Sequence, residues 1–147
     1  MTDIRNTNFK ELKEIYEMGK QRHVGEFLNN KTLETHEEEF KSSGVIYLSI
    51  INSSGLLAGY IIICKEKQSR RIQLKRILID EDFLGIGQEA IKLLENYCIR
   101  EYGINHIWLD VYGMNARAIY VYEKLGYIKI KEKTQNSKLV LYYDKRL

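Results

Sequence analysis

The chain has 147 residues, the size of one domain, so we expect a single domain over residues 1–147. Hydrophobic residues make up 44% of it and charged residues 29%, a balance that excludes an intrinsically disordered chain. The net charge of +3 is too small to indicate nucleic-acid binding, and no apolar run reaches the roughly 18 residues that a membrane span needs.

The two cysteines, Cys64 and Cys98, are far apart in the sequence and lack the spacing of metal ligands. No N-terminal stretch combines a basic region with an apolar one, as a secretory signal would. We therefore expect reduced thiols, a cytoplasmic location and no metal site.

The N-terminal quarter carries two helix signals. Asn8 and Glu11 have the spacing of a capping box, and apolar residues then recur at helical intervals. A weaker helix is expected at Leu33–Lys41, with Thr35 and Glu38 as its capping box.

Strands follow. Val45–Ile51 and Leu56–Lys65 are rich in Val, Ile and Tyr and flank a polar turn at residues 52–55, which predicts an antiparallel hairpin. Ile72–Ile79 predicts a third strand.

The hydrophobic period then switches between helix and strand. A helix is expected from Ile86 to Gly103, a strand at Ile104–Val111 and a helix from Asn115 to Gly126. A final hairpin should join Tyr127–Ile130 to Leu139–Tyr143 around residues 135–137. The crossover predicts that Ile72–Ile79 and Ile104–Val111 run parallel.

The strongest local signal is the loop Asp80–Gln88, which contains Gly85 and Gly87 between a strand and an amphipathic helix. Glycines let the backbone approach a ligand, and a helix start offers unpaired N–H groups to an anion such as a pyrophosphate. A plain tight turn or a dinucleotide-binding fold would also fit this loop alone.

A second segment follows the strand that ends at Val111. Read with the glycine loop, it resembles the GNAT superfamily of acetyl-CoA-dependent N-acetyltransferases. The family pattern N-x-x-A-x-x-x-Y-E-K-x-G-F/Y is matched at Asn115, Ala118, Tyr122, Glu123, Lys124, Gly126 and Tyr127. The resemblance implies an α/β fold whose twisted mixed sheet, flanked by helices, has a splayed parallel strand pair.

The resemblance also implies acetyl transfer from acetyl-CoA to an amine by direct attack. It places the pyrophosphate at Leu84, Gly85, Ile86, Gly87 and Gln88, and the pantetheine arm along Ile77, Leu78 and Ile79 with Asn115. Ala118 and Lys124 are the further residues expected to bind the cofactor. Tyr122 would be the general acid. From the residues alone, Tyr122 could equally be a core residue and Asn115 a helix cap.

Two departures from the family pattern stand out. Asp82 occupies a place that is Arg or Gln in the family, which predicts weaker binding of CoA unless Lys92, Arg117 or Lys124 compensates. Gln73 lies in the region where some relatives carry a Glu that acts as base, so the base is not identified. Candidates for it are His23, Glu26, His36 and His106, and an ordered water relay is the alternative.

The acceptor is also open. Glu34 and the run Glu37–Glu39 could attract a cationic acceptor such as a polyamine or an aminoglycoside, or could be an exposed helix face. We expect an acetyltransferase that acts on a primary amine of a small molecule or peptide, as a monomer or homodimer. A non-catalytic acyl-CoA sensor and a nucleotide-binding module are the alternatives.

Overall fold

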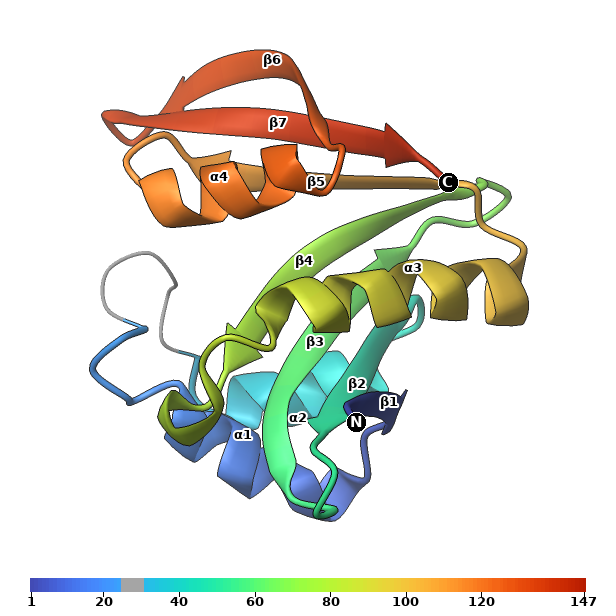
Figure 1. The fold of residues 1–147 in the computed structure, drawn as a ribbon, viewed down its shortest axis with the longest axis vertical. Helices are drawn as coiled ribbons and strands as arrows, with labels where there is room; N and C mark the ends of the chain where they lie inside the picture. Colours follow the sequence, from blue (N-terminus) through green and yellow to red (C-terminus); the bar gives the residue numbers. More distant parts are fainter. Residues whose placement is uncertain (25–30) are drawn as a thin grey trace.

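Seven β-strands form one sheet, in the order β1-β2-β3-β4-β5-β7-β6 (Figure 1). The computed structural model describes residues 1–24 and 31–147. The strands are β1 Asp3–Asn6, β2 Val45–Ile51, β3 Leu57–Lys65, β4 Arg71–Ile79, β5 His106–Tyr112, β6 Ile128–Gln135 and β7 Lys138–Arg146. The helices are α1 Leu12–Met18, α2 Leu33–Lys41, α3 Gly87–Tyr102 and α4 Ala116–Lys124, with short 3-10 turns η1 Phe9–Glu11 and η3 Glu81–Phe83.

The parallel pair of the sheet, β4 with β5, is paired over a short stretch. Pairing joins residues 71–73 of β4 to residues 106–108 of β5, yet β4 continues to Ile79 and β5 to Tyr112. The other neighbouring strands are antiparallel. The prediction of a mixed sheet with a splayed parallel pair is therefore confirmed.

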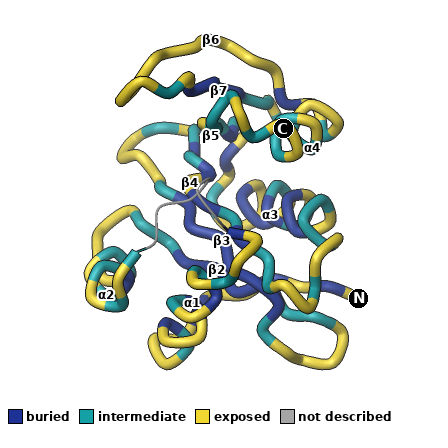
Figure 2. The backbone as a smooth tube through the Cα atoms, turned by 90° about the vertical axis from the view of Figure 1, so that its left-hand side faces the viewer, coloured by how far each residue is buried: buried dark blue, intermediate teal, exposed yellow. Residues whose placement is uncertain are grey.

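Each face of the central sheet has its own core, because side chains alternate along a strand. Ile61 and Ile63 of β3 belong to the larger core under α3, whereas Tyr60 and Ile62 pack with Ile15 of α1 on the opposite face. Figure 1 shows α3 crossing one face and α1 and α2 on the other, and Figure 2 shows the buried backbone concentrated in the central strands and α3.

A β-bulge in β4 changes which of its residues face α3. The register with β3 shifts by one residue between Leu74 and Arg76, so Lys75 is the extra residue. Leu74 and Ile77 consequently share the face that meets α3, and Arg76 lies beside Ile62 on the face of α1 and α2. An unbroken period of two would have placed Arg76 on the same face as Leu74.

Two expectations about the N-terminal region need correction. The strand β1 has no alternating apolar pattern and was not predicted; it pairs with β2 at the sheet edge and buries Ile4. The cap of α2 is Thr32, whose hydroxyl accepts from the N–H of Thr35, so the capping box predicted at Thr35 and Glu38 is wrong. The helix starts three residues earlier than that box requires.

The other elements lie where the sequence predicts them. Glu11 accepts from the N–H of Asn8 at 2.9 Å, as in a capping box. The strands β6 and β7 extend beyond the predicted hairpin, because β6 is an exposed edge strand without an apolar face (Figure 2). None of the helices in the described residues is both long enough and apolar enough to cross a membrane.

Candidate active site

The splay between β4 and β5 opens into a cavity of about 820 Å³, a size typical of small-molecule sites. Its walls, as far as the structure describes them, come from β4, β5, the start of α3, α4, the glycine loop, the end of β6, β7 and the residues that follow α1 or precede α2. The lining residues are His23, Val24, Lys31, Leu74, Lys75, Arg76, Ile77, Leu78, Ile79, Leu84, Gly85, Gly87, Gln88, Ile91, Asp110, Val111, Tyr112, Asn115, Arg117, Ala118, Val121, Tyr122, Gln135 and Val140. All the site residues predicted from the sequence line this cavity except Ile86 and Lys124.

The glycine loop forms one end of the cavity, at the start of α3. Gly85 has a φ of +108°, a conformation that favours glycine, and a Cβ there would meet nothing within 4 Å. In the part of the chain that the structure describes, no side chain caps α3 at Ile86, which leaves the first N–H groups of the helix available at its positive dipole end. Open space above unpaired amides fits a pyrophosphate.

Side chains that follow α1 hold this loop in place. Gln21 donates to Asp80 at 2.9 Å and accepts from the N–H of Glu81 at 2.9 Å. His23 Nε2 lies 2.6 Å from the carbonyl oxygen of Ile79. Asp80 also accepts from the N–H of Asp82, so Asp80 caps the turn η3 and Asp82 remains exposed.

The edge of β4 supplies a second set of backbone groups. Beyond Gln73 this edge has no strand partner on the β5 side among residues 1–24 and 31–147, although β3 continues to pair with Ile77, Leu78 and Ile79 on the other side. An unpaired strand edge that lines a cavity can bind an extended ligand as an added strand would. The arrangement fits the pantetheine arm expected along Ile77–Ile79.

Tyr122 lies on α4 and both packs against the core and lines the cavity. Its hydroxyl makes no hydrogen bond within the described chain. Burial, and secondarily the negative charge of Asp110, raises the pKa of Tyr122 to about 12. The phenol therefore keeps its proton at neutral pH and can donate a hydrogen bond into the cavity.

The other residues of the α4 motif position this helix beside the cavity. Asn115 caps α4, because its side-chain oxygen accepts from the N–H of Ala118 at 3.3 Å, and it also lines the cavity. Glu123 accepts from the hydroxyl of Tyr143 at 2.8 Å, which ties α4 to β7. The buried Tyr127 donates to Glu95 of α3 at 2.9 Å. These contacts fix α4 against α3 and the sheet.

Ile86 and Lys124 lie outside the cavity. Ile86 packs against the core at the start of α3. Lys124 borders a smaller groove of about 440 Å³ between α3 and α4, which is also lined by Gln88 and Lys92. Because Gln88 lines both spaces, the groove continues from the glycine-loop end of the cavity. Arg117, the third cation proposed to compensate for Asp82, lines the cavity itself.

Asp110 of β5 is a site residue that the sequence analysis missed. It is the one carboxylate among the described residues of the cavity lining. Its side chain is open to the cavity, and partial desolvation by the surrounding protein raises its pKa above the usual value. The available signal was its place in β5: Ile107, Leu109 and Val111 alternate toward the core, which turns Asp110 to the opposite face, at the splayed end.

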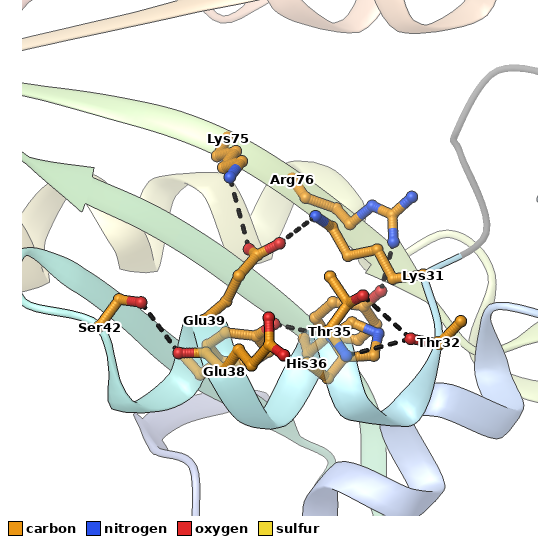
Figure 3. Close-up of polar contacts among 11 residues, drawn as sticks. Lys31, Thr32, Thr35, His36, Glu38, Glu39, Ser42, Lys75 and Arg76 are labelled. Atoms are coloured by element: carbon orange, nitrogen blue, oxygen red, sulfur yellow. Dashed lines mark hydrogen bonds and ion pairs between the residues drawn. The ribbon is translucent and has the colours of Figure 1, made fainter.

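Three cations form the part of the lining nearest α2, and we call Lys31, Lys75 and Arg76 the basic corner. Lys31 and Lys75 both pair with Glu39 of α2, the latter at 3.4 Å (Figure 3). Arg76 donates to the hydroxyl of Tyr60 at 3.3 Å. Successive residues of a regular strand point to opposite faces, so the sequence did not predict that Lys75 and Arg76 would line one cavity. The β4 bulge at Lys75 breaks this alternation.

The acidic residues of α2, Glu34 and Glu37–Glu39, are not part of the cavity lining that the structure describes. Glu39 is engaged by the two lysines, and Glu34, Glu37 and Glu38 do not line the cavity. The interpretation of this run as an attraction for a cationic acceptor therefore lacks structural support.

The residues considered as bases are dispersed. His36 is buried, and its Nδ1 lies 2.7 Å from the hydroxyl of Tyr47. His106 pairs with Asp144 at 2.9 Å, in the paired part of β5, and Gln73 lies outside the cavity lining. His23 does line the cavity. Glu26 lies outside the described residues, among which no cluster suited to a metal ion is found.

Two solved acetyltransferases share this fold. Spermidine N-acetyltransferase from Vibrio cholerae, in complex with CoA and spermine, is 15% identical and superposes with a TM-score of 0.86 over 99% of this chain and 95% of that chain. The aminoglycoside acetyltransferase AAC(6')-Ib, in complex with coenzyme A and kanamycin, is 18% identical, with a TM-score of 0.82 over 99% and 95%.

Sequence comparison identifies the family. Streptothricin acetyltransferase from Streptomyces lavendulae is 28% identical over 79 residues, which cover 52% of this chain and 41% of that relative, so the match spans less than half of the relative's length. The sequence profile of the acetyltransferase (GNAT) family matches residues 6–127. As the two motifs predict, the chain therefore belongs to the acetyltransferase (GNAT) family.

Proposed function

We propose that this protein transfers an acetyl group from acetyl-CoA to a primary amine of a small molecule or peptide, by direct attack within a ternary complex. The observation that carries the proposal is one cavity with a glycine-loop anion site at one end, the unpaired edge of β4 along its wall and Tyr122 inside it. Solved relatives that hold CoA with spermine or kanamycin support an amine acceptor.

Bound acetyl-CoA would supply an activated thioester. The N–H groups of Gly85, Gly87 and Gln88 would hold the pyrophosphate, and Ile77–Ile79 would align the pantetheine arm with the edge of β4. Unpaired N–H groups of the same edge would stabilise the negative charge that develops on the carbonyl oxygen.

Tyr122 would act on the leaving sulfur. A phenol with a pKa of about 12 is a weaker acid than a thiol, whose pKa is about 8.5, so complete proton transfer to a thiolate is unfavourable by roughly 5 kcal/mol. We therefore assign the Tyr122 hydroxyl chiefly the role of a hydrogen-bond donor that stabilises the developing thiolate. This role requires only that the phenol stay protonated, which its raised pKa ensures.

Two residues of the lining are candidates to accept the proton that the amine loses. Asp110 supplies a carboxylate whose raised pKa suits it to accept a proton, and His23 supplies an imidazole. Asp110 is our preferred base, because its charge also acts on Tyr122 and it therefore lies close to the reacting centre.

The test is release of free CoA thiol by the purified protein with acetyl-CoA and a panel of amines, with the acetylated product identified by mass spectrometry. Amine-dependent release supports the proposal. Tight binding of CoA without release for any amine would favour the alternative of a non-catalytic acyl-CoA sensor, for which Gln73 and Asp82 are the motivating departures.

The compartment and the assembly are further proposals. Cys64 and Cys98 are free thiols, and burial raises the pKa of Cys98 to about 12, so both suit a reducing cytoplasm. The exposed edge strand β6 is the surface on which a homodimer would form if the protein is not a monomer.

A further inference from the structure

The sheet has a face at β5, β7 and β6 that no helix of the described structure covers. On β5 and β7, Leu109 and Leu141 point toward the core that α3 and α4 share, whereas α1 and α2 form their core with β2, β3 and β4. Figure 2 shows β6 and β7 at the other end of the molecule from α1 and α2. The even-numbered residues of β5 and β7 therefore lie on a face without a helix, beside Lys131 and Lys133 of β6 and Arg71 of β4. We call it the outer face.

The outer face gathers positive charge. Its five cations are Arg71, Lys131, Lys133, Lys138 and Arg146, and its two carboxylates are Asp110 and Asp144. Asp144 is bonded to His106 at 2.9 Å. None of the five cations forms an ion pair with a residue that the structure describes. The modest net charge of the chain is thus concentrated on one surface, which attracts a polyanion.

Four of these cations lie over aromatic rings of the same face. The distances to the ring centroids are 4.7 Å for Lys131 and 5.6 Å for Lys133 over Tyr142, 5.2 Å for Lys138 over Tyr112 and 5.7 Å for Arg71 over Trp108. Trp108 and Tyr142 stack on one another, with their centroids 6.3 Å apart. A cation over a ring in water is held weakly, so an arriving anion can bind it without first breaking an ion pair.

The combination of cations and rings indicates the kind of polyanion. Single-stranded nucleic acids are bound by cations that follow the phosphates and by aromatic rings on which the bases stack. An open sheet face offers both in one plane, and sheet-based RNA-binding domains use their strands in this way. An acidic peptide would use the cations alone and would leave Trp108, Tyr112 and Tyr142 without a role.

From this juxtaposition we propose that the outer face binds single-stranded RNA. Phosphates would lie at the lysines and at Arg71, and bases would stack on Trp108 and Tyr142. Gln135, whose amide donates to the Tyr142 hydroxyl at 3.2 Å, and Gln73 beside Trp108 add hydrogen-bonding groups for 2′-hydroxyls, which favours RNA over DNA. This binding does not depend on the proposed acetyl transfer.

Fluorescence anisotropy with labelled 12-mers tests the kind of ligand. The probes are an unstructured RNA of A and C, the DNA of the same sequence, the RNA duplex with its complement, and a 12-residue polyglutamate. The single-stranded RNA should bind at least fivefold more tightly than the DNA and tenfold more tightly than the duplex or polyglutamate, and its affinity should fall steeply with salt. Equal affinity for polyglutamate or the duplex would overturn the single-strand assignment, and equal affinity for the DNA would overturn the choice of RNA.

Charge substitutions locate the surface. Lys131→Gln with Lys133→Gln should weaken RNA binding about tenfold at low salt and reduce the slope of log affinity against log salt by about 1.4, because each lost phosphate contact contributes about 0.7. Lys10→Gln with Lys129→Gln removes the same charge at exposed positions off the outer face, and should change neither quantity. Equal losses in the two double variants would overturn the inference.

A ring substitution separates stacking from charge. Tyr142→Ala should weaken RNA binding roughly 5- to 100-fold, Tyr142→Phe should retain most of the affinity, and Tyr120→Ala, at an exposed position of α4, should bind normally. Thermal unfolding of each variant is measured alongside, and the lysine variants test the surface independently of this packing.

Saturating CoA separates the outer face from the coenzyme site. The glycine loop leads into α3 on the other face of the sheet, so CoA should leave RNA binding unchanged. RNA that CoA displaces, or that does not bind at all at low salt, would overturn the inference. No amine acceptor is present in these measurements, so neither result bears on acetyl transfer, and a failure of acetyl transfer leaves the RNA result intact.

Discussion

The two ends of the cavity offer a ligand different kinds of groups. The glycine-loop end offers backbone amides and the dipole of α3, contributed by one continuous stretch of chain around Gly85 and Gly87. The basic corner offers ionised side chains from separate places: Lys31 before α2, and Lys75 and Arg76 at a bulge in β4. The first depends on open space above the backbone, and the second depends on charge.

This difference predicts how each end responds to change. A site built from backbone amides tolerates most side-chain substitutions and fails when a side chain fills its space. A site built from ionised side chains responds to single charge substitutions, to salt and to the pH dependence of its framework.

Gly87→Glu should abolish binding of CoA for practical purposes. A carboxylate placed about 4–5 Å from a phosphate costs about 3–4 kcal/mol at an effective dielectric constant of about 20, equivalent to a few hundredfold in affinity. Calorimetry with CoA measures the loss. Ile99→Glu adds the same charge to an exposed position of α3 away from the cavity and should bind CoA normally. Unchanged affinity in a folded Gly87→Glu protein contradicts the pyrophosphate assignment.

The framework of the basic corner should be acid-sensitive through His36. Its pKa falls from 6.5 to about 4 on folding, so the unfolded chain binds more protons in this window. Stability should therefore be complete above pH 6.5 and fall by at most about 3 kcal/mol as the pH drops toward 4. Urea unfolding across this range checks the slope. His36→Gln should flatten the slope. An equal slope in the wild type and His36→Gln contradicts the assignment.

Tyr122→Phe should lower turnover by roughly 100-fold with little change in the KM for acetyl-CoA, because the lost hydrogen bond belongs mainly to the transition state. Tyr120→Phe removes an exposed hydroxyl from the same helix and should be fully active. Thermal unfolding is measured alongside, because Tyr122 also packs against the core. Full activity of a stable Tyr122→Phe protein would leave Tyr122 with a packing role alone.

Asp82→Arg should tighten CoA binding by roughly three- to fivefold at low salt, and the gain should disappear as salt screens it. Asp82 is exposed beside the glycine loop, and its side chain makes no hydrogen bond within the described residues, so the substitution changes charge without removing a contact. A gain that persists at high salt, or a loss of affinity, would show that the departure at this position is not electrostatic.

The same contrast explains how much could be predicted from the sequence. The glycine loop, Asn115 and Tyr122 belong to continuous motifs, and the structure brings them to one cavity. Lys75 and Arg76 were not predicted as cavity residues because a bulge breaks the period of two along β4, and no local sequence pattern indicates a bulge. Asp110 was not predicted because its place in the cavity depends on where β5 diverges from β4, and the whole sheet determines that point.

The fold shows the same limit. Most elements were predictable because their apolar residues follow the period of a helix or a strand, but β1 contributes little to the core beyond Ile4 and has no such pattern. The cap of α2 was misplaced because Thr32 and Thr35 are both good caps, and the choice between them depends on where the chain leaves residue 31. Packing between distant segments decides such details.

A crystal structure of the protein with CoA would locate the pyrophosphate and the sulfur of the coenzyme in one measurement. The account predicts that the pyrophosphate accepts hydrogen bonds from the N–H groups of Gly85–Gln88, that the pantetheine arm lies along Ile77–Ile79, and that the sulfur lies within hydrogen-bond distance of the Tyr122 hydroxyl. A coenzyme whose phosphates bind at Lys75 and Arg76, or whose sulfur lies outside the splay, would contradict it.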